Sequence, residues 1–74
     1  MTSNDTTKTM TDEQLLNATY EAGVNYGKWR ARYQERKQQF PSHSYYRINA
    51  YVQMLNASEE SNRLIKIANK RGLA

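Results

Sequence analysis

The first half of the chain carries a helical period of apolar positions, and this pattern constrains the fold more than any other feature. The spacing of 4, 3, 4, 3, 4 and then 7 residues is typical of one face of an α-helix. A proline disfavours helical dihedral angles in the residue before it, so Pro41 ends this helix. The sequence therefore predicts a helix from about 12 to 39. The positions on its apolar face are Leu15, Thr19, Ala22, Tyr26, Trp29, Tyr33 and Phe40.

The beginning of this helix has several start signals. Thr11 and Gln14 have the spacing of a capping box, and Asp12 and Glu13 suit the positive end of the helix dipole. Gly23 and Gly27 complicate its middle, because each costs roughly 1 kcal/mol relative to alanine. Either the helix breaks near Gly23, or it continues and another element crosses it closely there. The period stays in phase across both glycines, which favours one continuous helix.

Two further helices are expected after Pro41. The first, from about 45 to 56, has Tyr45, Ile48, Val52 and Leu55 on one face, so we expect it to be the most enclosed element. Asn56-Ala57-Ser58 interrupts the pattern and starts a new helix from about 59 to 71. Gly72 followed by Leu73 predicts a left-handed C-cap with a hydrophobic contact.

These elements predict an all-α, three-helix domain. With 74 residues the chain has room for one domain, placed at 11–74, after a flexible polar tail at 1–10. The helices at 45–56 and 59–71 have the lengths of a helix-turn-helix pair. The chain has no cysteine, so a disulfide or a thiolate metal site is excluded.

The segment from 28 to 37, KWRARYQERK, is the main candidate for a functional surface. Its net charge of +4 equals that of the whole chain. In one interpretation the cations meet acidic side chains or phosphates while Trp29 and Tyr33 anchor the contact. In the other interpretation, the aromatic residues face the protein core and the cations lie on the opposite, solvent-exposed side of the helix. The predicted partner-binding residues are Lys28, Trp29, Arg30, Arg32, Tyr33, Arg36 and Lys37.

A pI near 9.6 predicts an anionic partner, either nucleic acid or an acidic protein surface. No apolar run reaches the ~20 residues of a membrane span, so we expect a cytoplasmic protein without membrane contact. We also expect it to be a monomer that binds no cofactor. No catalytic triad, paired carboxylates or phosphate loop can be assembled. The single histidine, His43, has no metal-ligand company and is expected on a surface turn. We therefore expect a protein that is not an enzyme.

Direct DNA binding is an alternative function. If residues 45–71 form a helix-turn-helix, the second helix would enter the major groove. The candidate nucleic-acid-binding residues on it are Ser61, Asn62, Arg63, Lys66 and Lys70. A third possibility is a bacteriophage inhibitor of another host protein that occupies the nucleic-acid channel of its target.

The size, the basic balance and the Thr/Ser/Asn-rich start, together with the segments TDEQLL (11–16) and KWRARYQERK (28–37), resemble the small host-takeover proteins of lytic bacteriophages. In particular, the chain is similar to the short transcription regulators that bind RNA polymerase, known from Xanthomonas phages. The resemblance implies a non-enzymatic protein in the host bacterial cytoplasm. It also implies inhibition of promoter-dependent initiation, antitermination, or both. It assigns no binding residue.

Overall fold

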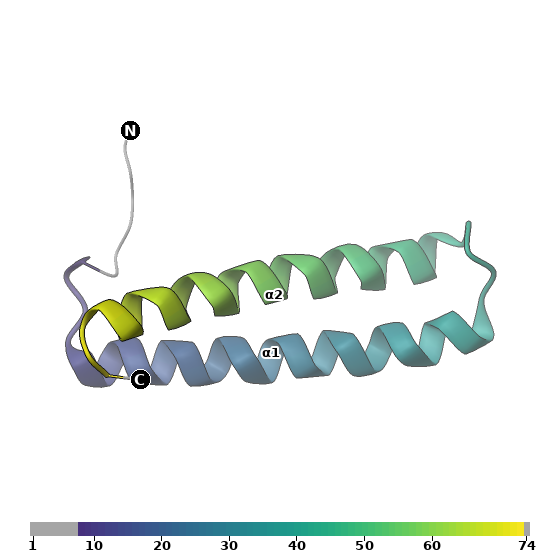
Figure 1. The fold of residues 1–74 in the computed structure, drawn as a ribbon. Helices are drawn as coiled ribbons and strands as arrows, with labels where there is room; N and C mark the ends of the chain where they lie inside the picture. The colour runs from purple at the N-terminus through teal and green to yellow at the C-terminus, as the bar shows by residue number, and fades with distance from the viewer. Residues whose placement is uncertain (1–7, 74) are drawn as a thin grey trace.

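The computed structural model describes residues 8–73, which form an antiparallel hairpin of two long helices (Figure 1). Helix α1 spans Asp12–Gln39 and helix α2 spans Tyr45–Lys70, with residues 40–44 as the turn between them. The molecule is about 43 Å long but only 15 Å thick in its thinnest direction. A single layer of two helices leaves both broad sides open to solvent. Most of the predicted flexible tail, residues 1–7, lies outside the described part of the chain.

The all-α prediction is confirmed, but the prediction of three helices is wrong. Helix α1 has the predicted bounds, whereas α2 runs without interruption through Asn56, Ala57 and Ser58. This tripeptide contains neither glycine nor proline, and Ala57 is buried with only 6% of its surface exposed. The chain therefore keeps its helix because a break would remove Ala57 from the interface between the helices. A helix-turn-helix pair is consequently absent from residues 45–70.

Each helix contributes one line of residues to the interface, which we call the seam. Every seam residue is buried or half-buried, and successive members are three or four positions apart, as in antiparallel coiled coils. The seam residues of α1 and its C-cap are Leu15, Thr19, Ala22, Tyr26, Trp29, Tyr33, Arg36 and Phe40. Those of α2 and its C-cap are Arg47, Ala50, Met54, Ala57, Ser61, Leu64, Ala68 and Arg71.

The seam sets large side chains of α1 against small side chains of α2. The Tyr33 and Tyr51 ring centroids are 5.2 Å apart, and Leu15 clusters with Leu64 and Ala68. In this antiparallel register, Ala50 falls at the level of Tyr33, and Ala57, seven residues later, falls at the level of Tyr26. The expectation that Tyr45, Ile48, Val52 and Leu55 would be enclosed is wrong, because these side chains are 42–73% exposed. Alanines occupy the interior position instead, since they let the aromatic residues of α1 fit between the helices.

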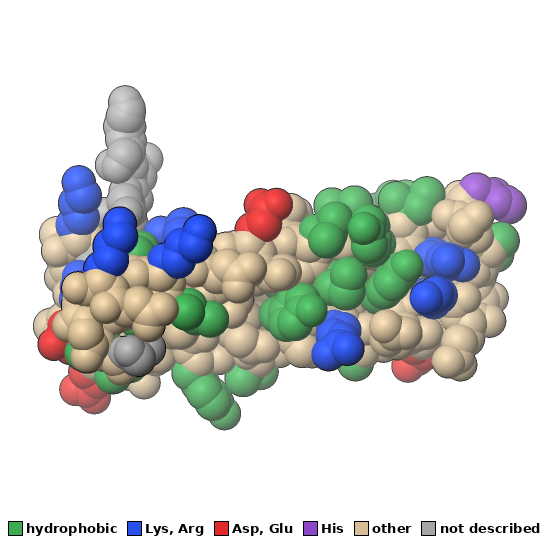
Figure 2. Space-filling view, in the orientation of Figure 1, with side chains coloured by type: hydrophobic (Ala, Val, Ile, Leu, Met, Phe, Trp, Pro, Cys, Tyr) green, Lys and Arg blue, Asp and Glu red, His purple; other side chains and the backbone are tan. Residues whose placement is uncertain are grey.

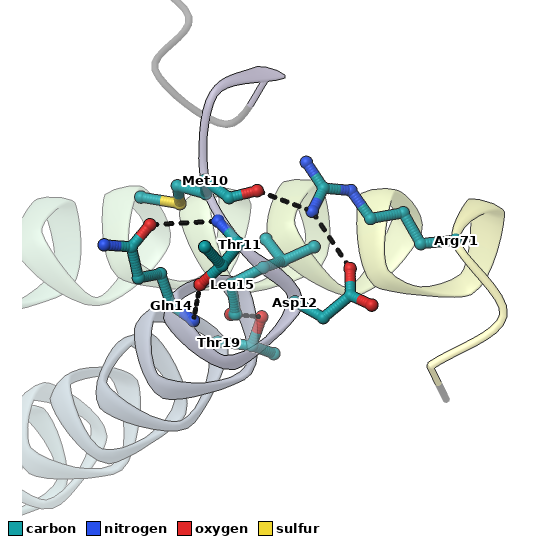
Figure 3. Close-up of polar contacts among 7 residues, drawn as sticks. All are labelled: Met10, Thr11, Asp12, Gln14, Leu15, Thr19 and Arg71. Atoms are coloured by element: carbon teal, nitrogen blue, oxygen red, sulfur yellow. Dashed lines mark hydrogen bonds and ion pairs between the residues drawn. The ribbon is translucent and has the colours of Figure 1, made fainter.

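Polar contacts close the open end of the hairpin (Figure 3). The predicted capping box is confirmed: the Gln14 N–H donates to Thr11 Oγ1 at 3.1 Å, and the Thr11 N–H donates to Gln14 Oε1 at 2.9 Å. Arg71, at the end of α2, donates from Nη1 to the Met10 carbonyl oxygen at 2.8 Å and to Asp12 Oδ1 at 3.3 Å. Arg71 therefore links the end of α2 to the beginning of α1.

The C-terminal end of α2 and the turn are also fixed by hydrogen bonds. Gly72 has a positive φ of 76°, and the Leu73 N–H donates to the Ala68 carbonyl at 2.9 Å, which confirms the predicted left-handed C-cap. Leu73 packs against the Leu15 cluster. At the turn, Arg47 Nη1 donates to the Phe40 carbonyl oxygen at 3.3 Å.

The two glycines of α1 lie within the continuous helix and face open space. A Cβ atom built on Gly23 or Gly27 would meet no atom within 4 Å. The continuous helix is thus confirmed, but no element of the hairpin crosses it closely at these residues. Their cost in helix stability has no compensation within the hairpin.

Removing the Ser58 hydroxyl tests the continuity of α2. We expect Ser58→Ala to leave the free energy of unfolding unchanged or to raise it by ~0.5 kcal/mol, because alanine is the better residue inside a helix. The control, Thr11→Ala, removes a real N-cap and should lower it by ~1 kcal/mol. Urea unfolding followed by circular dichroism measures both values. Equal losses for the two variants would indicate that a helix begins at Ser58.

Enlarging a seam alanine tests the size match between the helices. Ala50 is fully buried, so Ala50→Leu should lower the free energy of unfolding by ~1–3 kcal/mol through overpacking. Ala31→Leu makes the same change at an exposed position of α1 and should alter stability by no more than ~0.5 kcal/mol. Thermal unfolding of both variants provides the comparison, and a tolerated Ala50→Leu would contradict the seam.

Candidate protein-binding surface

The hairpin has two broad faces of different chemistry. Because the helices are antiparallel, residues directly following a seam residue lie on the same side in both helices. Those directly preceding a seam residue lie on the other side. We call the side with the following residues the apolar face and the other side the polar face.

The apolar face carries large exposed side chains from both helices. Tyr20 is 74% exposed, and the others are 40–46% exposed. Figure 2 shows hydrophobic side chains gathered on one broad side of the rod, mainly over the half nearest the connecting turn. Soluble monomers rarely leave such a set uncovered, so this face is a candidate interaction surface. Its large apolar members are Leu16, Tyr20, Ile48, Tyr51, Leu55 and Ile65.

The basic segment at 28–37 is divided between the two faces. Lys28 and Arg32 precede the seam residues Trp29 and Tyr33, so they lie on the polar face, and both are exposed. Arg30 and Lys37 follow seam residues and lie on the apolar face, also exposed. The segment therefore does not present one continuous row of cations.

Arg36 is the member of the segment that turns inward. It is half-buried, and its Nη1 donates to the Tyr46 carbonyl oxygen at 3.2 Å across the turn end of the hairpin. It fills the seam position between Tyr33 and Phe40 that the apolar period leaves empty. The contact of Arg36 therefore joins parts of the hairpin, whereas Arg32, one turn earlier, is exposed to solvent.

The aromatic residues of the segment belong to the seam. Tyr33 packs on Tyr51, and Trp29 is half-buried with the Arg32 guanidinium carbon 4.8 Å from its ring centroid. A cation this close to an indole face is attracted to it. Trp29 and Arg32 thus form one amphipathic unit at the edge of the polar face, where the guanidinium stays accessible.

The exposed cations of α1 have no acidic partner among the residues that the structure describes. Ion pairs in residues 8–73 join Arg63 to Glu60 at 2.8 Å and Arg71 to Asp12 at 3.3 Å. Within the same residues, Lys28, Arg30, Arg32 and Lys37 are not held in any such pair. Their charge is available to an external anionic group.

The predicted nucleic-acid-binding residues all lie on the C-terminal half of α2. Asn62, Lys66 and Lys70 recur every four residues along an exposed side, whereas Ser61 is half-buried in the seam. Arg63 binds Glu60 through two hydrogen bonds of 2.8 and 3.0 Å. In a helix-turn-helix, the residues that contact DNA bases lie on a helix that follows a turn, whereas these residues lie in the continuous helix α2.

Cavities and ligand clusters offer little in this hairpin. A shallow hollow of about 150 Å³ is lined by Tyr33, Ser42, Arg47, Ile48 and Tyr51, below the ~300–1,000 Å³ of typical small-molecule pockets. His43 is exposed in the turn, as the sequence predicts. The part of the chain that the structure describes contains no group of three or more residues suited to a metal ion. Neither helix is long and apolar enough to cross a membrane.

Comparison with known proteins gives no relative. No protein-family model, no curated protein and no solved structure matches this chain.

Sequence reasoning missed the apolar face, although its signal is present. Leu16, Tyr20, Gly23 and Gly27 keep the same spacing as the α1 seam, one residue later. We read the apolar residues of α2 as interior because a helix surrounded by neighbours has the same composition. The roles of Arg47 and Arg71 were also missed, since a contact between helices leaves no local pattern.

The different positions of two cations in the basic segment can be tested by their effects on stability. Arg36→Ala removes the hydrogen bond to the Tyr46 carbonyl and should lower the free energy of unfolding by about 1 kcal/mol. Lys28→Ala is the control at an exposed position of the polar face and should change it by less than ~0.5 kcal/mol. Urea denaturation measures the free energy of unfolding of both variants, and equal losses would contradict the inward position of Arg36.

Proposed function

We propose that this protein acts by binding another macromolecule, without catalysis of its own, and that its target is bacterial RNA polymerase. The observation that supports a binding role is the exposed positive charge on α1, which forms no ion pair with the other residues of 8–73. Lys28 and Arg32 stand one turn apart on the polar face, beside the half-buried Trp29. This arrangement suits an acidic protein surface, with Arg32 stacked on Trp29 and so restrained before binding.

The choice of RNA polymerase comes from the resemblance of the segments 11–16 and 28–37 to phage transcription regulators. On this proposal the protein inhibits promoter-dependent initiation, prevents termination, or does both. We expect a mechanism in which binding blocks or holds a surface of the polymerase. Direct action through a helix-turn-helix is not proposed, because α2 contains no turn.

Charge reversal on the polar face tests the proposed contact. We expect the immobilised full chain to retain RNA polymerase from a bacterial lysate and to alter transcription by the purified enzyme. Lys28→Glu combined with Arg32→Glu should weaken binding at least tenfold, and raised salt should weaken the wild type.

The control is Lys66→Glu combined with Lys70→Glu, an equal change of charge at exposed positions of α2. This control should keep polymerase binding close to that of the wild type. Failure to retain any polymerase subunit contradicts the proposed target. Equal losses in both double variants contradict the proposed surface. Salt-sensitive binding of free duplex DNA that only the α2 variant loses supports the DNA-binding alternative instead.

A further inference from the structure

The apolar face is at the upper end of the ~300–600 Å² that the largest apolar patch of a soluble monomer covers, and patches of this size are often functional. From their exposed fractions, its six large apolar side chains present on the order of 500–600 Å², before any polar rim is counted. A standard interface takes about 800 Å² from each partner. The buried hydrophobic residues of the hairpin are only two leucines and three alanines among residues 8–73. Small proteins with such a limited core commonly gain stability by association.

We propose that the apolar face binds a second copy of this chain, which produces an antiparallel four-helix bundle. In this dimer, the two-fold axis lies in the plane between the two apolar faces and runs perpendicular to the helices. As a result, α1 lies antiparallel to α1 of the second copy. Likewise, α2 lies antiparallel to α2 of the second copy. This inference concerns a different face from Lys28 and Arg32 and does not depend on the identity of the target.

Charge complementarity along α1 supports a second copy as the occupant. Residues 12–21 contain three acidic side chains and no basic one, and of these Glu13 lies in line with Tyr20 on the apolar face, seven residues earlier. Of the five basic side chains in residues 28–37, Arg30 and Lys37 lie on this face. An antiparallel partner brings the acidic half of one α1 to the basic half of the other. On the apolar face, this pairing sets Glu13 opposite Lys37 of the second copy. It also sets Tyr20 opposite Arg30, a favourable arrangement of cation and aromatic ring.

The glycines fall where the two copies of α1 would meet most closely. A two-fold axis that pairs Glu13 with Lys37 also pairs Gly23 with Gly27, near the centre of α1. The open space above both glycines allows a neighbouring helix to approach there. In the register of the hairpin, Ser58 of α2 lies at the same level as these glycines. The same axis sets Tyr51 opposite Ile65 on α2.

The proposal accounts for two features that the isolated hairpin leaves unexplained. One is the pair of glycines inside a helix with nothing packed on them. The other is the exposed side of α2 that carries Ile48 and Leu55, which were expected from the sequence to be interior and which become interior in the dimer. The dimer differs from the monomer expected from the sequence.

A charge-swap experiment tests the pairing of Glu13 with Lys37. Sedimentation equilibrium of the full wild-type chain should give twice the 8.7 kDa mass of one chain at micromolar concentration. Glu13→Lys and Lys37→Glu should each weaken dimerisation about tenfold, because symmetry places each altered contact twice in the dimer. The double variant should restore the dissociation constant to within about threefold of wild type. Within one chain these residues are about 36 Å apart along α1, so recovery requires a second copy.

A glycine substitution separates association from folding. Gly23→Leu should leave helix content by circular dichroism equal to or above that of the wild type, because its side chain enters open space in the hairpin. The same variant should be monomeric. Ala31→Leu, on the exposed side of α1 away from the interface, should remain dimeric. A wild type that is monomeric up to millimolar concentration, a Gly23→Leu variant that dimerises normally, or a double variant without recovery would each overturn the proposal.

Discussion

The fit between aromatic residues of α1 and alanines of α2 is the interaction on which this structure depends. In the antiparallel register, Tyr26 and Tyr33 fall at the levels of Ala57 and Ala50, and Tyr33 also contacts Tyr51 beside the seam. Ala50 and Ala57 provide the space, and both are buried for that reason. The fit sets the register, and the register decides which residues follow or precede the seam. The chemistry of the two broad faces is therefore a consequence of where the alanines stand.

This arrangement explains how much of the fold the sequence could predict. Helix α1 was predicted to the residue, because Thr11, Gln14 and Pro41 are local signals that act through the neighbouring backbone. The C-cap at Gly72 was predicted for the same reason. The middle of α2 was not, because its continuity rests on Ala57 packing against the other helix. Alanine carries a weak hydrophobic signal, while the polar residues beside it suggested a turn.

The candidate surface was predictable in composition but not in arrangement. The sequence locates the positive charge on 28–37, and four of its five cations are exposed. It could not show that Arg36 turns inward to the Tyr46 carbonyl, since that contact depends on the path of the turn. Nor could it show that Lys28 and Arg30 point to opposite sides of the rod. That separation follows from the position of the seam between them, at Trp29.

The location of the best-packed cluster has a consequence for how the hairpin folds. Leu15, Leu64 and Ala68 gather at the end farthest from the turn, and Arg71 reaches Met10 across 61 residues of sequence. The chain must therefore lose most of its conformational entropy before its strongest apolar contacts form. Contacts nearer the turn, such as that between Tyr33 and Tyr51, close shorter loops and therefore cost less conformational entropy. We therefore expect the end of the hairpin farthest from the turn to close late in folding, when the beginning of α1 meets the end of α2.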